Sequence, residues 1–161
     1  MKSSRSFQNG TGTVAITNEE IEREKKTLPF GWGRFGKALD ELAEISEPNE
    51  SLLASCVALN PEYRQDGRYV PGTLLSAAHE LRKSTNVVLA CTTERLIMIS
   101  TGVTGAPRQH ISLPFDGIEI AERAPRVFVL GGPDGRIKIR GAAKQQVPAF
   151  LEALEAKLRP V

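Results

Sequence analysis

The most apolar stretch of the chain runs from Asn86 to Ser100 and contains two short hydrophobic runs. These runs, Val87 to Cys91 and Leu96 to Ile99, are separated by the polar residues Thr92 to Arg95. Short apolar runs bounded by polar turn residues are typical of buried strands. We therefore predict a β-hairpin here, in the middle of an antiparallel sheet.

Five further segments have the composition or alternation of strands. They are Leu52 to Leu59, Gln109 to Leu113, Gly117 to Glu122, Val127 to Leu130 and Arg136 to Arg140. The last two flank Gly131 to Gly135, which has the composition of a hairpin turn. After the first strand we expect a loop from Asn60 to Gly72. Thr73 to Lys83 follows as a short helix or an irregular strand extension.

A short charged helix is predicted near the N-terminus. Thr17 and Glu20 have the spacing of a capping box, in which each side chain accepts a hydrogen bond from the other's backbone amide. The helix then runs from Asn18 to Lys26 and ends before Pro29. Ile21 is its one apolar residue, so we expect only weak attachment to a core.

A second helix, from Gly33 to Ile45, carries an apolar stripe that begins at Phe35 and follows the only tryptophan, Trp32. One interpretation packs this helix across the domain or against a sister subunit, with Trp32 as an anchor. The other places it at a membrane interface, where aromatic residues lie at head-group level. Its opposite face is acidic, whereas interfacial helices usually carry Lys and Arg, so we favour packing.

The clearest amphipathic pattern runs from Lys144 to Arg159 and predicts a C-terminal helix. Its apolar positions are Val147, Phe150, Leu151, Leu154 and Leu158. Pro148 lies in the first turn and Pro160 follows the end, as is typical of helix boundaries. Such a stripe must be covered, and the predicted sheet is the only large surface available.

These patterns divide the chain into three parts. Residues 1–16 are polar and Gly-rich, so we predict a disordered tail. Residues 17–46 form an N-terminal helical extension. Residues 50–159 form a compact α+β domain in which several antiparallel strands are closed by one C-terminal helix.

Within that domain, Leu89 to Ile99 resembles the hallmark of bacterial pleckstrin-homology-like (PH-like) domains. There an apolar strand meets a Thr-Asp/Glu-x-Arg-Leu-type turn and a second apolar strand. Ile111 to Ile118 is similar to a later strand of the same family. The resemblance implies a strongly bent antiparallel sheet, or partly open barrel, capped by the C-terminal helix. Asn60 to Lys83 is longer than the family's usual turn, and Thr17 to Ile45 is outside the pattern.

The hairpin turn has a physical role in this reading. The hydroxyl of Thr92 or Thr93 can satisfy turn amides. Arg95 has five donors in a planar fork and can bind nearby carbonyls or a carboxylate. We therefore predict that Thr92 and Arg95 are structural residues of the motif.

Composition excludes several function classes. The net charge of +2 is too small to predict a polyanion-binding protein. Cys56 and Cys91 lie apart in apolar runs, as buried reduced thiols do. The only histidines, His79 and His110, lie in no nucleophile or metal-ligand pattern. With no signal-peptide core and no apolar run of roughly 20 residues, we predict a cytoplasmic protein that is no enzyme and holds no metal or cofactor.

The arrangement of basic residues is the sequence feature that says most about function. Arg136, Lys138 and Arg140 alternate with two isoleucines, so one strand face carries all three bases. That face can meet anionic lipid head groups, a nucleic-acid backbone or an acidic protein. Alternatively it is a solvated face that discourages strand pairing, which we prefer. It lacks interleaved aromatic residues for base stacking, so we do not expect nucleic acid.

These observations predict a non-catalytic interaction module that binds a protein partner or self-associates. The candidate contact residues are Trp32, Phe35, Arg136, Lys138 and Arg140. The alternative is peripheral binding to anionic membrane lipids through the basic strand face. An enzyme of unrecognised type is the least favoured reading, since it needs a pocket with converging polar groups around a histidine.

Overall fold

The computed structural model describes residues 15–59, 61–65, 86–132 and 135–159. The predicted disordered tail lies almost entirely outside the described residues. The same holds for most of the predicted loop from Asn60 to Gly72 and for the segment from Thr73 to Lys83. What is described is an α+β structure with two antiparallel sheets and a C-terminal helix.

The first sheet contains the predicted hairpin at its centre. Its strands follow the order β1 (Leu52–Leu59), β3 (Asn86–Thr92), β4 (Leu96–Thr101) and β5 (Pro107–Leu113). The β3–β4 hairpin turns between Thr92 and Leu96, as the apolar runs predicted, and both of its strands have a neighbour on each side.

The second sheet follows the order β2 (Glu62–Gln65), β8 (Gly135–Ile139), β7 (Phe128–Gly132) and β6 (Glu119–Arg123). β2 lies where a loop was expected, so that prediction was wrong. Its four residues form a strand by pairing with β8, which is distant in sequence, and their polar composition offers no apolar alternation to detect.

The chain passes from the first sheet to the second between β1 and β2, which are separated by residues 60 and 61. On the other side, β5 and β6 each end their own sheet and do not pair with one another. The two sheets therefore do not close into a barrel.

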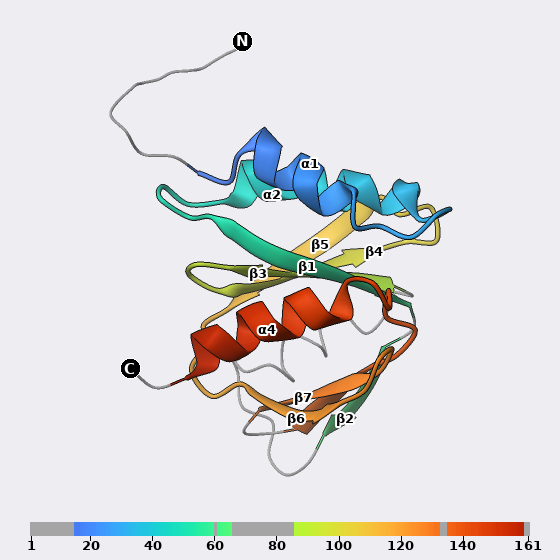
Figure 1. Cartoon of the computed structure of the whole chain (residues 1–161), viewed down its shortest axis with the longest axis vertical. Helices are drawn as coiled ribbons and strands as arrows, with labels where there is room; N and C mark the ends of the chain where they lie inside the picture. The colour runs from blue at the N-terminus through green and yellow to red at the C-terminus, as the bar shows by residue number, and fades with distance from the viewer. Residues whose placement is uncertain (1–14, 60, 66–85, 133–134, 160–161) are drawn as a thin grey trace.

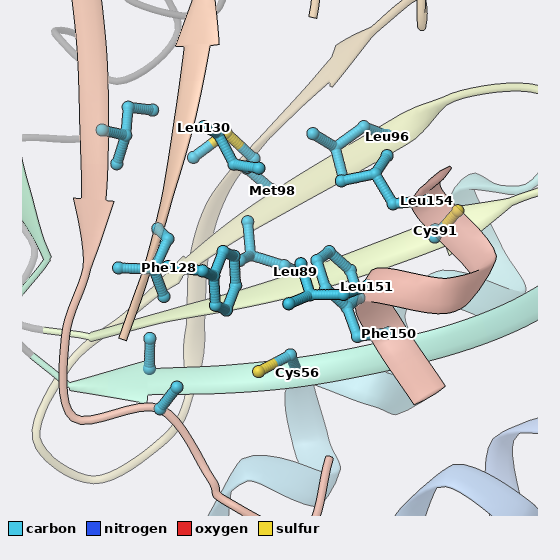
Figure 2. Packing of buried hydrophobic residues seen from close by; sticks show 14 of the residues in the cluster. Cys56, Leu89, Cys91, Leu96, Met98, Phe128, Leu130, Phe150, Leu151 and Leu154 are labelled. Atoms are coloured by element: carbon cyan, nitrogen blue, oxygen red, sulfur yellow. The ribbon is translucent and has the colours of Figure 1, made fainter. Parts of the chain in front are cut away.

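The β3–β4 hairpin is buried on both faces, and each residue of its two strands is buried. The faces alternate as strand geometry requires. Leu89 and Met98 belong to a core shared with the second sheet and the C-terminal helix, whereas Val88 and Ile97 belong to a core shared with the N-terminal helices. Figure 2 shows the first core, where Leu89 and Met98 lie with Phe128 of β7.

Helix α4 (Val147–Leu158) supplies the first core with its apolar stripe. It lies between the two sheets, beside β1 (Figure 1). The rings of Phe128 and Phe150 are 5.8 Å apart and connect the second sheet to this helix. The predicted covering of the hairpin by the C-terminal helix is therefore confirmed, although the helix begins three residues later than expected.

Helices α1 (Asn18–Lys25) and α2 (Gly36–Ile45), with the short 3-10 helix η1 (Gly33–Phe35), cover the other face of the first sheet (Figure 1). Both hydrogen bonds of the predicted capping box, between Thr17 and Glu20, are present. The second helix packs within the chain, which agrees with the preferred of the two interpretations.

The expectation of weak attachment for α1 was wrong. Ile21 is buried in the N-terminal core, and polar contacts also attach the helix to β1. Glu24 is also buried, and its Oε1 accepts hydrogen bonds from the amide of Ser55 at 2.9 Å and from its hydroxyl at 2.8 Å. Arg23 donates to the carbonyl of Leu52 at 2.6 Å. A helix with one apolar residue is held by its charged residues, which hydropathy patterns do not register.

The same kind of contact covers the outer edge of β1. The Leu52 amide donates to Glu20, and the Val57 amide donates to the buried Gln146 side chain at 2.8 Å. The Val57 carbonyl accepts a hydrogen bond from the backbone of Ala143. These bonds satisfy strand groups that would otherwise invite pairing with another chain.

Two phenylalanines five positions apart test whether the N-terminal helices are part of the folded domain. Phe35 is fully buried and Phe30 is fully exposed. We expect Phe35→Ala to lower the free energy of unfolding by about 3–5 kcal/mol, because it leaves a cavity under the sheet. Phe30→Ala should change it by less than about 0.5 kcal/mol. Urea unfolding measures both, and equal effects would contradict the packing described.

Candidate interaction sites

The β3–β4 turn is built around a buried ion pair. Glu50 has no exposed surface, and its Oε2 accepts hydrogen bonds from Thr92 Oγ1 at 2.6 Å and Arg95 Nε at 2.9 Å. Arg95 Nη2 donates to Glu50 Oε1 at 3.1 Å and to the carbonyl of Ile45 at 2.8 Å. Arg95 thus connects the end of α2 to the hairpin turn. Its other terminal nitrogen, Nη1, is exposed and donates a hydrogen bond to the Ser112 hydroxyl.

Sequence reasoning did not identify Glu50 as the partner of this arginine. Glu50 ends the polar, Pro-containing segment Glu47 to Glu50 between the two predicted parts, and an acid there resembles any surface residue. The backbone places it: Asn49 has a φ of 66°, a left-handed conformation that Asn tolerates better than most residues. Only the three-dimensional structure brings the carboxylate under the turn.

Burial and pairing act in opposite directions on Glu50. Burial on its own raises the pKa of the carboxyl group, but hydrogen bonds from Arg95, Thr92 and the Glu47 amide outweigh it. The pKa of Glu50 is therefore lowered from its ordinary value of 4.5. Hydrogen bonding to Glu50 also raises the pKa of Arg95.

The predicted basic strand face lies on the outer side of the second sheet, where Arg136, Lys138 and Arg140 are exposed. Acidic residues adjoin it on the β2 side. Lys138 lies opposite Glu62 in the strand register, and Arg140 forms an ion pair with the same Glu62.

Acidic residues adjoin the face on the β6 side as well. Glu119 pairs with Gly131, the β7 residue opposite Arg136, and its carboxylate lies over that glycine. Glu122 pairs with the β7 residue opposite Lys138. Among the side chains that the structure describes, one acid thus lies on the strand next to β8, and two more lie one strand further away, on β6. This balance weakens the attraction of the face for an anionic membrane.

The two aromatic candidates lie elsewhere. Phe35 has no exposed surface and packs in the N-terminal core, so a partner has no access to it in this conformation. Trp32 is half-buried and meets the Phe35 ring edge-on, with centroids 5.9 Å apart. Both lie beyond the first sheet from the basic strand face (Figure 1). The sequence-predicted contact residues therefore do not form one site.

A trough along the edge of β6 was missed by sequence reasoning. One hollow of about 330 Å³ lies between the strand and the end of α4, with apolar walls from Ile118, Ile120 and Leu158. A second, of about 400 Å³, is lined by Leu151 and Pro148 among others. Both share Arg123 and Glu155 as lining residues. The trough was undetectable in the sequence because its two walls are distant in the chain.

An ion pair spans the trough between the two hollows. Arg123 Nη2 lies 3.0 Å from Glu155 Oε2, and Arg159 Nη2 lies 3.7 Å from the other oxygen of Glu155. Two guanidinium groups therefore share one carboxylate. The outer edge of β6 has no partner strand among those described.

Nucleophilic and metal chemistry find little support among the described residues. Burial raises the pKa of Cys56 and of Cys91 to about 12 in each case, so neither thiol is a nucleophile at neutral pH. No group of three or more His, Cys, Asp or Glu residues lies together in the described part. His110 is exposed on β5, while His79 lies outside the described residues. The predicted absence of an enzyme site, metal or cofactor stays a prediction.

None of the described helices has the length and apolar composition needed to cross a membrane. A scan against protein-family models finds no match to this sequence, and a search of curated proteins finds none.

The Glu50–Arg95 pair predicts a pH-dependent stability. Because the folded-state pKa of Glu50 is depressed, its contribution is complete above its unfolded-state pKa and is lost as the pH falls through the folded-state value. We expect Glu50→Gln to lower the free energy of unfolding by about 3 kcal/mol at pH 7, since it leaves Arg95 without its charged partner.

The difference between wild type and Glu50→Gln should shrink as the pH falls below about 4.5, because wild-type Glu50 then becomes protonated too. Urea unfolding at pH 7 and at successively lower pH measures it. The exposed Glu44→Gln is the control and should match the wild type at pH 7. A penalty for Glu50→Gln that is constant with pH would show that the pair does not titrate as described.

Proposed function

We propose that the protein is a non-catalytic interaction module with a PH-like fold, and that it binds an extended segment of a partner protein between β6 and α4. The fold assignment is supported by the four-stranded first sheet, the β6–β7–β8 meander and the closing helix α4. The resemblance of Leu89 to Ile99 to the family's hallmark is its second support. The binding mode is supported by the β6 edge and the trough beside it.

The single observation that carries this proposal is the contrast between two sheet edges. The outer edge of β1 is covered by side chains from α1 and from the residues before α4. The outer edge of β6 has no partner strand among those described, and it borders two hollows with apolar walls. An uncovered edge beside apolar hollows is the arrangement that accepts an added strand.

Strand addition determines the chemistry of the bound segment. Its backbone would pair with β6, and side chains two positions apart would point to the same side. Apolar side chains on that side fit the hollows around Ile120 and Leu151. An acidic side chain between them fits the two guanidinium groups, Arg123 and Arg159, which share Glu155. We therefore propose a segment with alternate apolar residues around one acid.

A random peptide library displayed on phage tests this function. We expect selection on the wild-type protein to enrich peptides with alternate apolar residues and an acid. Leu158→Glu should weaken their binding at least about tenfold, because it puts a charge in place of one of the three apolar side chains that line the hollow. The matched control is Ala156→Glu, an exposed position on the same helix that does not line the trough.

Amide chemical shifts then locate the bound peptide. Changes centred on residues 119–123 and on α4 are expected, with circular dichroism confirming that both variants are folded. Failure to enrich any peptide, or equal peptide binding by Leu158→Glu and wild type, would refute the trough as the contact site. Light scattering tests self-association. If a second copy of the chain supplies the bound segment, Leu158→Glu lowers the molecular mass measured in solution and Ala156→Glu does not.

A further inference from the structure

Two exposed apolar side chains lie on the two segments that meet where the N-terminal helices reach the β4–β5 connection. Phe30 is 105% exposed and Val103 is 75% exposed, and they are two of the three large hydrophobic side chains exposed among the described residues. Arg34 Nε donates to the carbonyl of Val103 at 3.1 Å and so joins the two segments. We term residues 26–37 and 102–108 the aromatic end; both lie at the same end of the molecule (Figure 1).

The two loops of the aromatic end are braced against each other. Arg34 Nη1 donates to the carbonyl of Gly31 at 3.1 Å. The carbonyl oxygen of Arg34 lies only 2.5 Å from the position of a Cβ on Gly105, whose φ is +86°. Any side chain at Gly105 would therefore clash and be strained. The Trp32 amide closes the intervening turn with a 3.0 Å backbone hydrogen bond. The backbone that carries the exposed side chains is thus held in place before binding, which lowers the entropic cost of association.

The aromatic end is basic, although the whole chain is nearly neutral, with 21 Lys and Arg against 19 Asp and Glu. Its two segments contain no acidic residue and four exposed bases: Lys26, Arg34, Lys37 and Arg108. The Arg108 guanidinium lies over the β4–β5 connection, with Nε 3.3 Å from the Cβ position of Gly102. Both segments that carry the two apolar side chains are therefore basic, although Glu41 of α2 lines a small hollow together with Arg108.

We propose that the aromatic end docks onto an anionic lipid bilayer, with Phe30 and Val103 entering the boundary between head groups and acyl chains. An aromatic and an aliphatic side chain on a protruding tip suit that boundary, and basic neighbours suit anionic head groups. Phe30 has no protein around it, so a protein partner would have to supply a complete pocket, whereas a bilayer needs none. This surface and its partner are separate from the β6–α4 trough.

The contrast with the basic strand face supports this choice of surface. Two of the three bases there have an acid beside them: Glu62 is the strand neighbour of Lys138 and the ion-pair partner of Arg140. The strand face also has no large exposed apolar side chain among the described residues. The two basic surfaces can therefore be compared directly, since the same charge change can be made in each.

The test uses the full chain with vesicles of phosphatidylcholine alone or with 30% phosphatidylserine. Trp32 is the only tryptophan and lies two residues from Phe30, so its fluorescence reports on the aromatic end. We expect co-sedimentation with the anionic vesicles alone, a shift of Trp32 emission to shorter wavelength, and quenching by brominated lipid. Binding should weaken as salt is raised.

Two pairs of variants decide between surfaces. Lys37→Glu with Arg108→Glu should reduce vesicle binding at least about twentyfold, and Phe30→Ala with Val103→Ala about tenfold. The matched control, Arg136→Glu with Lys138→Glu, makes the same charge change on the basic strand face and should bind nearly as the wild type does. Far-UV circular dichroism checks that every variant is folded.

Equal binding to neutral and anionic vesicles, or no binding to either, would overturn the proposal. So would loss of binding in the strand-face control with the aromatic-end variants unaffected. Leu158→Glu, the trough variant, should bind vesicles as the wild type does. Failure of peptide binding and failure of membrane binding are therefore distinguishable.

Discussion

The β3–β4 hairpin is apolar on both faces, and this one property requires a layer of structure on each side of the first sheet. On one side the second sheet and α4 supply the cover, with Phe128 and Phe150 in contact. On the other side α1 and α2 supply it, with Phe35 buried beneath them. Strands buried on both faces lose the alternation of half-exposed strands, which explains why Val87 to Cys91 is continuously apolar.

Polar groups fix how these layers are positioned. Glu24 holds α1 on β1, and Glu50 with Arg95 holds the end of α2 on the hairpin turn. Gln146 links the start of α4 both to β1 and to the Thr27 hydroxyl. Each of these groups is satisfied by a specific partner, as buried polar groups must be. Together they make the N-terminal helices part of the same folded unit as the sheets.

This arrangement also decides which surfaces remain for function. The outer edge of β1 is covered, whereas β6 has no partner strand on its outer edge among those described and borders a hollow on each side of the Arg123–Glu155 pair. Packing Phe35 and part of Trp32 inward leaves Phe30 outward on a braced turn. The two surfaces lie on different elements. A module that uses both would bring a bound protein segment to a membrane surface.

The sequence by itself determined the hairpin, the first strand, the capping box and the amphipathic closing helix, because each depends on neighbours within a few residues. It missed β2, whose polar residues form a strand only by pairing with β8. It also missed the role of Glu50, because the partner of this carboxylate is an arginine 45 positions away in the sequence. Only the tertiary structure decided that Phe35 is interior and Phe30 exterior, and that the basic strand face is flanked by acids. The burial of a side chain and the charge balance around it depend on which distant segments meet. Local sequence patterns do not show which segments these are.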